Sequence, residues 1–254
     1  MLEIRNLSAG YENEMILKDV SLSLPQGAVT IIAGPNGCGK STLLKALAGI
    51  IQSTGSAVLE GEELLELSGK KLARKVAFLP QNRPVPEITV KNLVLHGRFP
   101  YLSYPRRYRQ EDQEIAESVM ARMGIGELAD RQLNTLSGGQ RQKVYIAMAL
   151  AQDTPVVLMD EPNTFLDIAH QLQLMEQARS LAREGKTVVL VLHDLSLALE
   201  YADTLAVLHQ GRCIFQGSPE EVFRSGCLNR AFGVDVRRIQ TPDGWKYYYS
   251  GNIE

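Results

Sequence analysis

Gly-Pro-Asn-Gly-Cys-Gly-Lys-Ser-Thr occupies positions 34 to 42 of the chain. It fits the pattern G-x-x-x-x-G-K-[S/T], in which glycines let the backbone approach a phosphate closely. Residues 28–33 form a short apolar run that predicts a buried strand, and residues 41–49 have the apolar spacing of a helix. A strand, a glycine-rich turn and a helix N-terminus together form a nest for anions. We therefore predict a phosphate-binding loop made of Gly34, Pro35, Asn36, Gly37, Cys38, Gly39, Lys40, Ser41 and Thr42.

Three side chains of this loop predict chemistry beyond backbone contacts. Lys40, on a surface loop, adds positive charge for the β- and γ-phosphates, and Ser41 offers a hydroxyl to Mg²⁺. Cys38 stands close to Lys40 and a helix N-terminus, both of which favour a thiolate. We therefore expect alkylation of Cys38 to inactivate the protein and Mg-ATP to protect it. The alternatives are a flexible glycine turn without a ligand and a thiol that points away.

Composition limits the classes of protein that need to be considered. The chain has 254 residues and a net charge of −2, which gives no electrostatic argument for nucleic-acid binding. Its longest apolar runs, such as residues 188–192, are far too short to span a bilayer, and its first residues do not form a signal peptide. The cysteines Cys38, Cys213 and Cys227 suggest neither a disulfide framework nor a metal site. We expect a protein of the cytosol.

Polar side chains follow two further apolar strands. Residues 155–159 predict a buried strand ending in Asp160, which is well placed to hold Mg²⁺ beside a phosphate loop. Glu161 could orient or deprotonate a water that attacks the γ-phosphate. His193 follows the strand predicted at residues 186–192 and should face the same crevice, where it could contact the γ-phosphate. The alternatives are ordinary surface charge for the carboxylates and a structural role for the histidine.

A second glycine-rich turn predicts another anion site. Leu136-Ser137-Gly138-Gly139-Gln140 opens a strongly patterned helix that runs to Ala151. Ser137 is a good N-cap, and the glycines expose backbone N–H groups at the positive end of the helix dipole. Simple capping is the alternative, but it needs no pair of glycines. We assign phosphate contact to Ser137, Gly138, Gly139 and Gln140.

The remaining elements surround these motifs. Residues 2–7 and 20–24 predict half-buried strands, and Tyr11 between them could stack on a base or only pack over a strand. Residues 87–153 have helical patterns and predict a helical insert between two halves of an α/β domain. Within it, residues 97–109 form a basic, aromatic loop that is either solvated or a contact surface for a partner or lipid headgroups. We expect Arg98, Arg106 and Arg107 to make that contact.

These motifs resemble those of the nucleotide-binding subunits of ATP-binding-cassette (ABC) transporters over nearly the whole chain. Six motifs follow one another in the family's order: residues 34–42 (Walker A), Gln81 (Q-loop), 136–140 (signature), 156–161 (Walker B), 166–167 (D-loop) and His193 (switch). The resemblance implies an α/β fold with a P-loop NTPase (RecA-like) core, an N-terminal antiparallel β subdomain and a helical insert subdomain. It places the core with its β subdomain at residues 1–86 and 154–240, the helical subdomain at 87–153 and a C-terminal tail at 241–254.

The same resemblance implies site roles and partners. ATP and Mg²⁺ would be the cofactors, with Lys40, Glu161 and His193 in catalysis, Tyr11 and Gln81 at the nucleotide, and Mg²⁺ held by Ser41, Gln81 and Asp160. ATP would draw two copies into a head-to-tail homodimer. Each nucleotide would then lie between the Walker A loop of one copy and the signature motif of the other, which fits two separate anion sites.

A narrower resemblance is to importer ATPases for iron–siderophore, haem and cobalamin, most of all the ferric-citrate and other ferric-siderophore members. It rests on residues 97–100, 163–167, 192–195 and 216–222. It implies integral-membrane permease subunits, indirect contact with a periplasmic or lipoprotein solute-binding protein, and a place on the cytoplasmic face of the membrane. Two other classes stay open: an ATPase for another solute or for export, and a soluble cassette ATPase of DNA repair or translation.

Overall fold

The phosphate loop follows strand β3, which lies inside a six-stranded sheet of the described residues. The computed structural model describes residues 1–12, 14–164, 166–242 and 244–251. The strand order is β10-β9-β3-β8-β7-β6, parallel except for β10 against β9. The strands are β3 (Val29–Ala33), β6 (Val76–Leu79), β7 (Val156–Asp160), β8 (Thr187–Val191), β9 (Thr204–His209) and β10 (Arg212–Gly217). The carboxyl ends of β3, β7 and β8 therefore meet at one edge of the sheet, as the sequence predicted.

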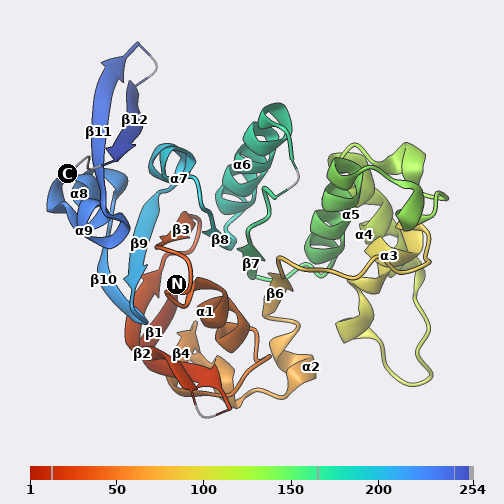
Figure 1. The fold of residues 1–254 in the computed structure, drawn as a ribbon. Coiled ribbons are helices and arrows are strands. Elements are labelled where there is room, and N and C mark those ends of the chain that lie inside the picture. Colours follow the sequence, from red (N-terminus) through yellow and green to blue (C-terminus); the bar gives the residue numbers. More distant parts are fainter. Residues whose placement is uncertain (13, 165, 243, 252–254) are drawn as a thin grey trace.

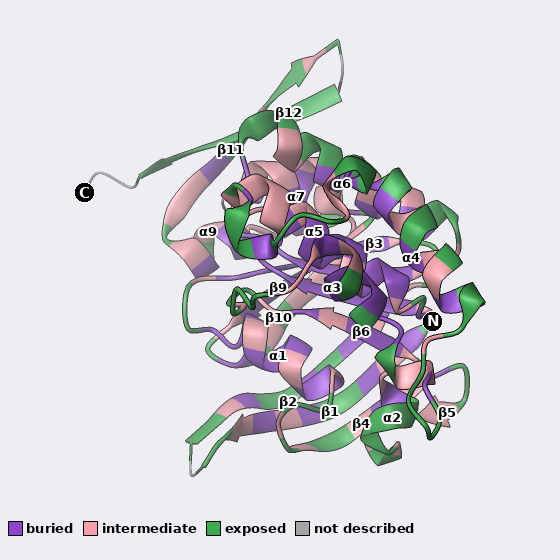
Figure 2. Cartoon of the chain, turned by 90° about the vertical axis from the view of Figure 1, so that its right-hand side faces the viewer, coloured by how far each residue is buried: buried purple, intermediate pink, exposed green. Residues whose placement is uncertain are grey.

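Two hydrophobic cores lie on opposite faces of this sheet. Ile31 of β3 packs into one core and Ile32 into the other, as the alternation of a strand requires. The second core also contains α1 (Lys40–Leu47), which lies between the large sheet and an antiparallel sheet with the order β2-β1-β4-β5. That sheet consists of β1 (Leu2–Tyr11), β2 (Glu14–Leu24), β4 (Ser53–Leu59) and β5 (Glu62–Glu63). In Figure 2 the buried positions gather in the strands and on the inner sides of the helices.

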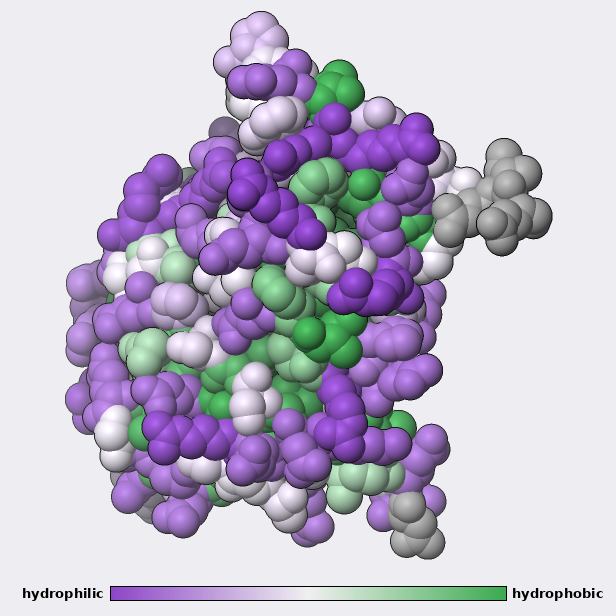
Figure 3. All heavy atoms as spheres, turned by 90° about the vertical axis from the view of Figure 1, so that its left-hand side faces the viewer, coloured by the Kyte–Doolittle hydropathy of each residue, from purple (hydrophilic) through white to green (hydrophobic). Residues whose placement is uncertain are grey.

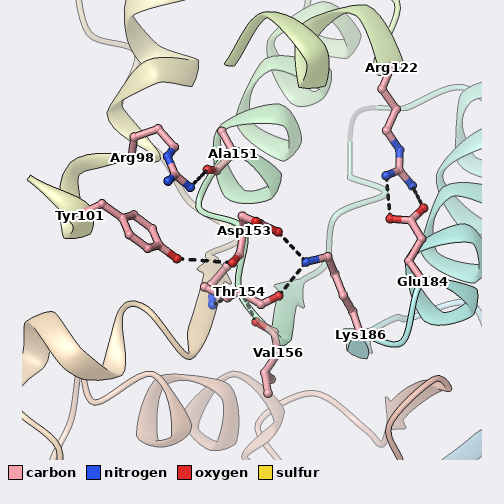
Figure 4. A network of polar contacts seen from close by, with 10 residues as sticks. Arg98, Tyr101, Arg122, Ala151, Asp153, Thr154, Val156, Glu184 and Lys186 are labelled. Carbon is pink, nitrogen blue, oxygen red and sulfur yellow. Dashed lines mark hydrogen bonds and ion pairs between the residues drawn. The ribbon is translucent and has the colours of Figure 1, made fainter. Parts of the chain in front are cut away.

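The chain between β6 and β7 forms a separate group of helices. It contains α3 (Val90–His96), α4 (Gln110–Arg122) and α5 (Gly138–Ala151), which lie together at one end of the sheet in Figure 1. Polar contacts join this group to the sheet and to α6 (Ile168–Arg183), as Figure 4 shows. Lys186 Nζ contacts Asp153 Oδ1 at 2.9 Å, and the Arg122 guanidinium donates to both carboxylate oxygens of Glu184.

The C-terminal part begins with short helices. These are α7 (Leu195–Tyr201), α8 (Pro219–Ser225) and α9 (Cys227–Phe232). Another short helix, α2 (Gly69–Leu72), lies earlier in the chain, between β5 and β6. The hairpin of β11 (Val234–Thr241) and β12 (Gly244–Gly251) stands away from the rest of the molecule in Figure 1. On that side, Figure 3 shows a hydrophobic area bordered by hydrophilic side chains. No helix among the described residues is long and apolar enough to cross a membrane.

The C-terminal boundary predicted at residue 241 falls inside a hairpin, because Thr241 pairs with Gly244 across its turn. Arg238 on this hairpin lies between the rings of Phe223 and Trp245 and forms an ion pair with Glu220, so the hairpin is anchored on α8.

Candidate functional site

The phosphate loop is tightly folded against two strands. Gly37 and Gly39 have φ values of +77° and +107°, which favour glycine. A Cβ atom on Gly39 would lie 2.6 Å from Leu17 Cδ2, and one on Gly34 would lie 2.3 Å from the Leu208 carbonyl oxygen. The glycines are therefore needed both for the turn and for the close approach of β2 and β9, and they leave the loop backbone bare at the start of α1.

Lys40 is buried, which corrects the expectation that it lies on the surface. Its side chain folds back on the loop, and Nζ donates to the carbonyl oxygens of Gly34 at 2.7 Å and Pro35 at 3.0 Å. Only 6% of the residue is exposed. Its ammonium group is thus held at the loop rather than free in solvent.

Ser41 and Asp160 meet where β7 ends beside the loop. Ser41 Oγ donates to Asp160 Oδ1 at 3.1 Å. Burial raises the pKa of Asp160, whereas the hydrogen bond from Ser41 lowers it. The described residues contain no cluster of three or more His, Cys, Asp or Glu side chains that could hold a metal ion. A serine hydroxyl and one carboxylate suit Mg²⁺, which binds through one or two protein groups together with substrate phosphates.

Glu161 is the centre of the polar contacts at this edge. Its backbone is left-handed, with φ +48°, a conformation that is uncommon outside glycine and concentrates at functional sites. One carboxylate oxygen accepts from Gln81 Nε2 at 2.5 Å, and the other lies 2.5 Å from His193 Nε2. The structure thus brings Gln81, Glu161 and His193 together from positions just after β6, β7 and β8.

Gln81, Glu161 and His193 line one cleft of about 440 Å³ together with residues of the phosphate loop. Tyr11 also lines it, is 43% exposed, and accepts a hydrogen bond from Lys45 Nζ at 3.2 Å. Ile16 of β2 borders the cleft as well. Sequence reasoning missed Ile16 and Lys45, because an apolar strand residue and a helical lysine carry no local signal of a site.

The second predicted anion site lies in a different cleft. Ser137 and Gln140 form a reciprocal capping box at the start of α5: Ser137 Oγ accepts from the Gln140 N–H, and Gln140 Oε1 accepts from the Ser137 N–H. A cleft of about 550 Å³ is lined by Ser137, Gly139, Gln140, Lys143, Asp167 and His170, among others. It shares no lining residue with the first cleft. Residues 163–167, on which the narrower resemblance partly rests, include Phe165, which lies outside the described residues.

The expected reactivity of Cys38 is wrong. Its thiol is buried and packs in the second core beneath the loop. Burial raises the pKa of the Cys38 thiol, and this outweighs the nearby Lys40 charge and the backbone N–H groups, which lower it. The thiol is therefore shielded, and the backbone of Cys38 is bonded within the protein: its N–H donates to the Pro35 carbonyl and its carbonyl accepts from the Gly211 N–H.

The expected exposure of Arg98 is also wrong. Arg98 is 6% exposed, and its Nε contacts Asp112 Oδ1 at 3.1 Å. Its Nη1 donates to the Ala151 carbonyl at 3.0 Å, and its guanidinium stacks on Tyr101 (Figure 4). Arg106 and Arg107 of the same loop are exposed.

Arg98→Ala should therefore destabilise the fold. Removing one member of a buried ion pair leaves Asp112 charged without compensation, which costs about 3–5 kcal/mol. Urea unfolding measures this loss, with Arg107→Ala as the control that should stay within about 0.5 kcal/mol of the original protein. Equal stability of the two variants would contradict a structural role for Arg98.

Comparisons with known proteins agree with this geometry. The pattern that defines the ABC transporter family matches residues 17–164. The achromobactin transport ATP-binding protein of Dickeya dadantii (strain 3937) is 43% identical over 241 residues, which cover 94% of this chain and 90% of the relative. The ferric enterobactin transport ATP-binding protein of Escherichia coli (strain K12) is 42% identical over 239 residues, covering 93% and 88%.

Solved structures show the same architecture. An inward-facing ABC transporter described as of metal-chelate type superposes with a TM-score of 0.83 at 26% identity, over 98% of this chain and 96% of that chain. A dimeric bacterial ABC transporter cassette gives 0.74 at 28% identity, over 86% and 99%. This chain belongs to the ABC transporter family, as an ATP-binding subunit with a P-loop NTPase fold. It is an ATPase coupled to transport.

Proposed function

We propose that this chain hydrolyses ATP to drive import of a ferric siderophore or a related metal chelate. The observation that carries the proposal is the convergence of Gln81 and His193 on Glu161 beside the phosphate loop. The solute is inferred from the relatives, whose names refer to achromobactin, enterobactin, petrobactin and ferric hydroxamate.

Each group of side chains in this cleft would have a separate role in ATP hydrolysis. The loop N–H groups and Lys40 hold the β- and γ-phosphates and stabilise charge that develops during transfer. Ser41, Asp160 and Gln81 would hold Mg²⁺, which neutralises phosphate charge when bound. Glu161 takes the proton of the water that attacks the γ-phosphate, while ADP leaves.

His193 and Tyr11 would complete the nucleotide site. His193 contacts Glu161 from β8 and would reach the γ-phosphate from that side. Tyr11 borders the phosphate cleft with an exposed ring and is proposed to stack on adenine. Substituting Tyr11 by Leu would remove the ring while keeping an apolar side chain.

A head-to-tail homodimer would complete the site. The phosphate loop lines one cleft of the chain, and Ser137, Gly139 and Gln140 line another, so one copy cannot enclose a nucleotide with both. In the dimer, the backbone of Gly138 and Gly139 would face the γ-phosphate bound to the other copy. The dimeric cassette among the similar structures supports this arrangement.

The partners would be permease subunits in the membrane, with a periplasmic or lipoprotein solute-binding protein acting indirectly. The chain would then lie on the cytoplasmic face of the membrane. The helical group between β6 and β7 (residues 87–153) would act as a subdomain against the core at 1–86 and 154–240. Its exposed Arg106 and Arg107 are proposed to contact the permease.

Deleting the gene and measuring uptake tests the solute. We expect uptake of one radiolabelled iron chelate, among carboxylate, catecholate and hydroxamate siderophores, to fall to background and to return with the intact gene. A Glu161→Gln copy should not restore it. Normal uptake of all three chelates together with loss of cobalamin uptake would overturn the assignment to iron.

A further inference from the structure

Arg83 holds the segment that carries Gln81. Its Nε donates to the carbonyl oxygen of Pro80 at 2.7 Å, immediately before Gln81. Its guanidinium carbon lies 4.8 Å from the centre of the Tyr145 ring, which belongs to α5. The Tyr145 hydroxyl donates in turn to the carbonyl oxygen of Pro84. Two side chains in contact with each other thus fix the backbone on both sides of Gln81.

The side chain of Gln81 needs such an anchor. Gln81 is exposed, so packing around it does not impose its direction. Its amide nevertheless lies 2.5 Å from the Glu161 carboxylate. An exposed amide holds that geometry only if the backbone beneath it is fixed.

The position of Arg83 is costly for the fold. One guanidinium nitrogen, Nη1, is buried and has no hydrogen-bond partner among the described residues. The guanidinium is therefore only partly satisfied where it lies against Tyr145 and Pro80. A group kept at such a cost beside a reaction site points to a role other than stability.

We propose that Arg83 is a positioning residue, which fixes Gln81 against Glu161 and joins that contact to α5, the helix that begins at the second anion site. The proposal rests on the ATPase roles proposed above for Gln81 and Glu161. It connects the two clefts of one chain through a single guanidinium. A change in the position of α5 would then displace Gln81.

The geometry requires arginine rather than any cation. A planar guanidinium can stack on Tyr145 and donate to Pro80 from its edge at the same time. Lysine has neither the plane nor the fork, so Arg83→Lys should behave nearly as Arg83→Met does.

The chain offers a closely matched control in Arg74. Its Nε also donates to a proline carbonyl, Pro100, at 3.0 Å, and its guanidinium lies 5.2 Å from the centre of a tyrosine ring, Tyr101. Neither Arg74 nor Tyr101 lines the cleft that contains Glu161. Arg74→Met removes the same kinds of contact away from the reaction.

The experiment is steady-state ATP hydrolysis by the whole chain. We expect Arg83→Met to lower kcat on the order of 10- to 100-fold, as misplaced groups do, with KM for Mg-ATP within about twofold. Tyr145→Phe should lower kcat less, because it loses only the bond to Pro84. Arg74→Met should retain the original kcat. Thermal unfolding shows which variants are folded. If Arg83→Met does not fold, Arg83→Lys and Tyr145→Phe test the proposal in its place.

A double-mutant cycle with Gln81→Ala separates positioning from a general loss of structure. If Arg83 acts through Gln81, Gln81→Ala combined with Arg83→Met should be no slower than Gln81→Ala alone. Multiplied losses in the double variant, or an unchanged kcat in folded Arg83→Met, would overturn the proposal for Arg83 alone. A Gln81→Ala variant with the original kcat would overturn it together with the role assigned to Gln81.

Discussion

Glu161→Gln should lower the rate of ATP hydrolysis by about 10²–10⁴-fold, the usual contribution of a positioned acid–base group. Glutamine has nearly the same shape as glutamate but cannot accept the proton of the attacking water. Asp160 and Ser41 are unchanged, and so is the phosphate loop with Lys40. Nucleotide affinity should therefore survive while turnover is lost, which a phosphate-release assay and equilibrium binding measure together.

The control for this change is a Glu→Gln substitution away from the cleft. Glu117 is exposed and pairs with Lys91 within the helical group, so Glu117→Gln removes a carboxylate without touching either anion site. It should keep the original rate. A Glu161→Gln variant that is as fast as Glu117→Gln would remove Glu161 from the role of base.

Lys40→Met should weaken ATP binding roughly 10- to 100-fold, since hydrogen bonds to a charged group contribute about 1.5–3 kcal/mol. Methionine fills a similar volume, which suits the buried position of Lys40 better than alanine does. The substitution also takes away the donor shared by the carbonyls of Gly34 and Pro35. Titration with a fluorescent nucleotide measures the affinity, and circular dichroism reports whether the loop change alters the fold.

Lys91→Met is the matched control, because Lys91 is half-buried and lies in the helical group, outside both clefts. Its nucleotide affinity should equal that of the original protein. If Lys40→Met bound ATP equally well, residues 34–42 would not be the phosphate-binding loop.

Local patterns in the sequence predicted most of the site. The turn at residues 34–42 and the carboxylates after residue 159 depend on backbone geometry that glycine spacing and apolar runs encode. The N-cap predicted at Ser137 is present, and the structure adds Gln140, three residues away, as its reciprocal capping partner. Parallel pairing of β7 with β8 then placed Glu161 beside His193, as their positions after two buried strands implied.

Burial and long-range contacts escaped prediction. Arg98 looked like part of a basic surface loop, yet its partners Asp112 and Ala151 come from later helices. The burial of Cys38 depends on the core between the two sheets, which its neighbours in sequence do not reveal. Arg83 and Tyr145 lie far apart in the chain and meet only when α5 packs beside the end of β6. For Arg98 and Cys38, the charge and the thiol suggested exposure, whereas the tertiary packing buries both side chains.

The central claim, two clefts of one chain that enclose ATP only across a dimer, is tested most directly by the mass of Glu161→Gln in solution. Light scattering coupled to size-exclusion chromatography, in millimolar ATP with Mg²⁺, should show a dimer, because slow hydrolysis traps the closed state. Adding Ser137→Arg should return the protein to a monomer, since bulk and charge at the start of α5 block the phosphate of the opposite copy. A Glu161→Gln protein that stays monomeric with ATP, or a dimer that is indifferent to Ser137→Arg, would contradict the account.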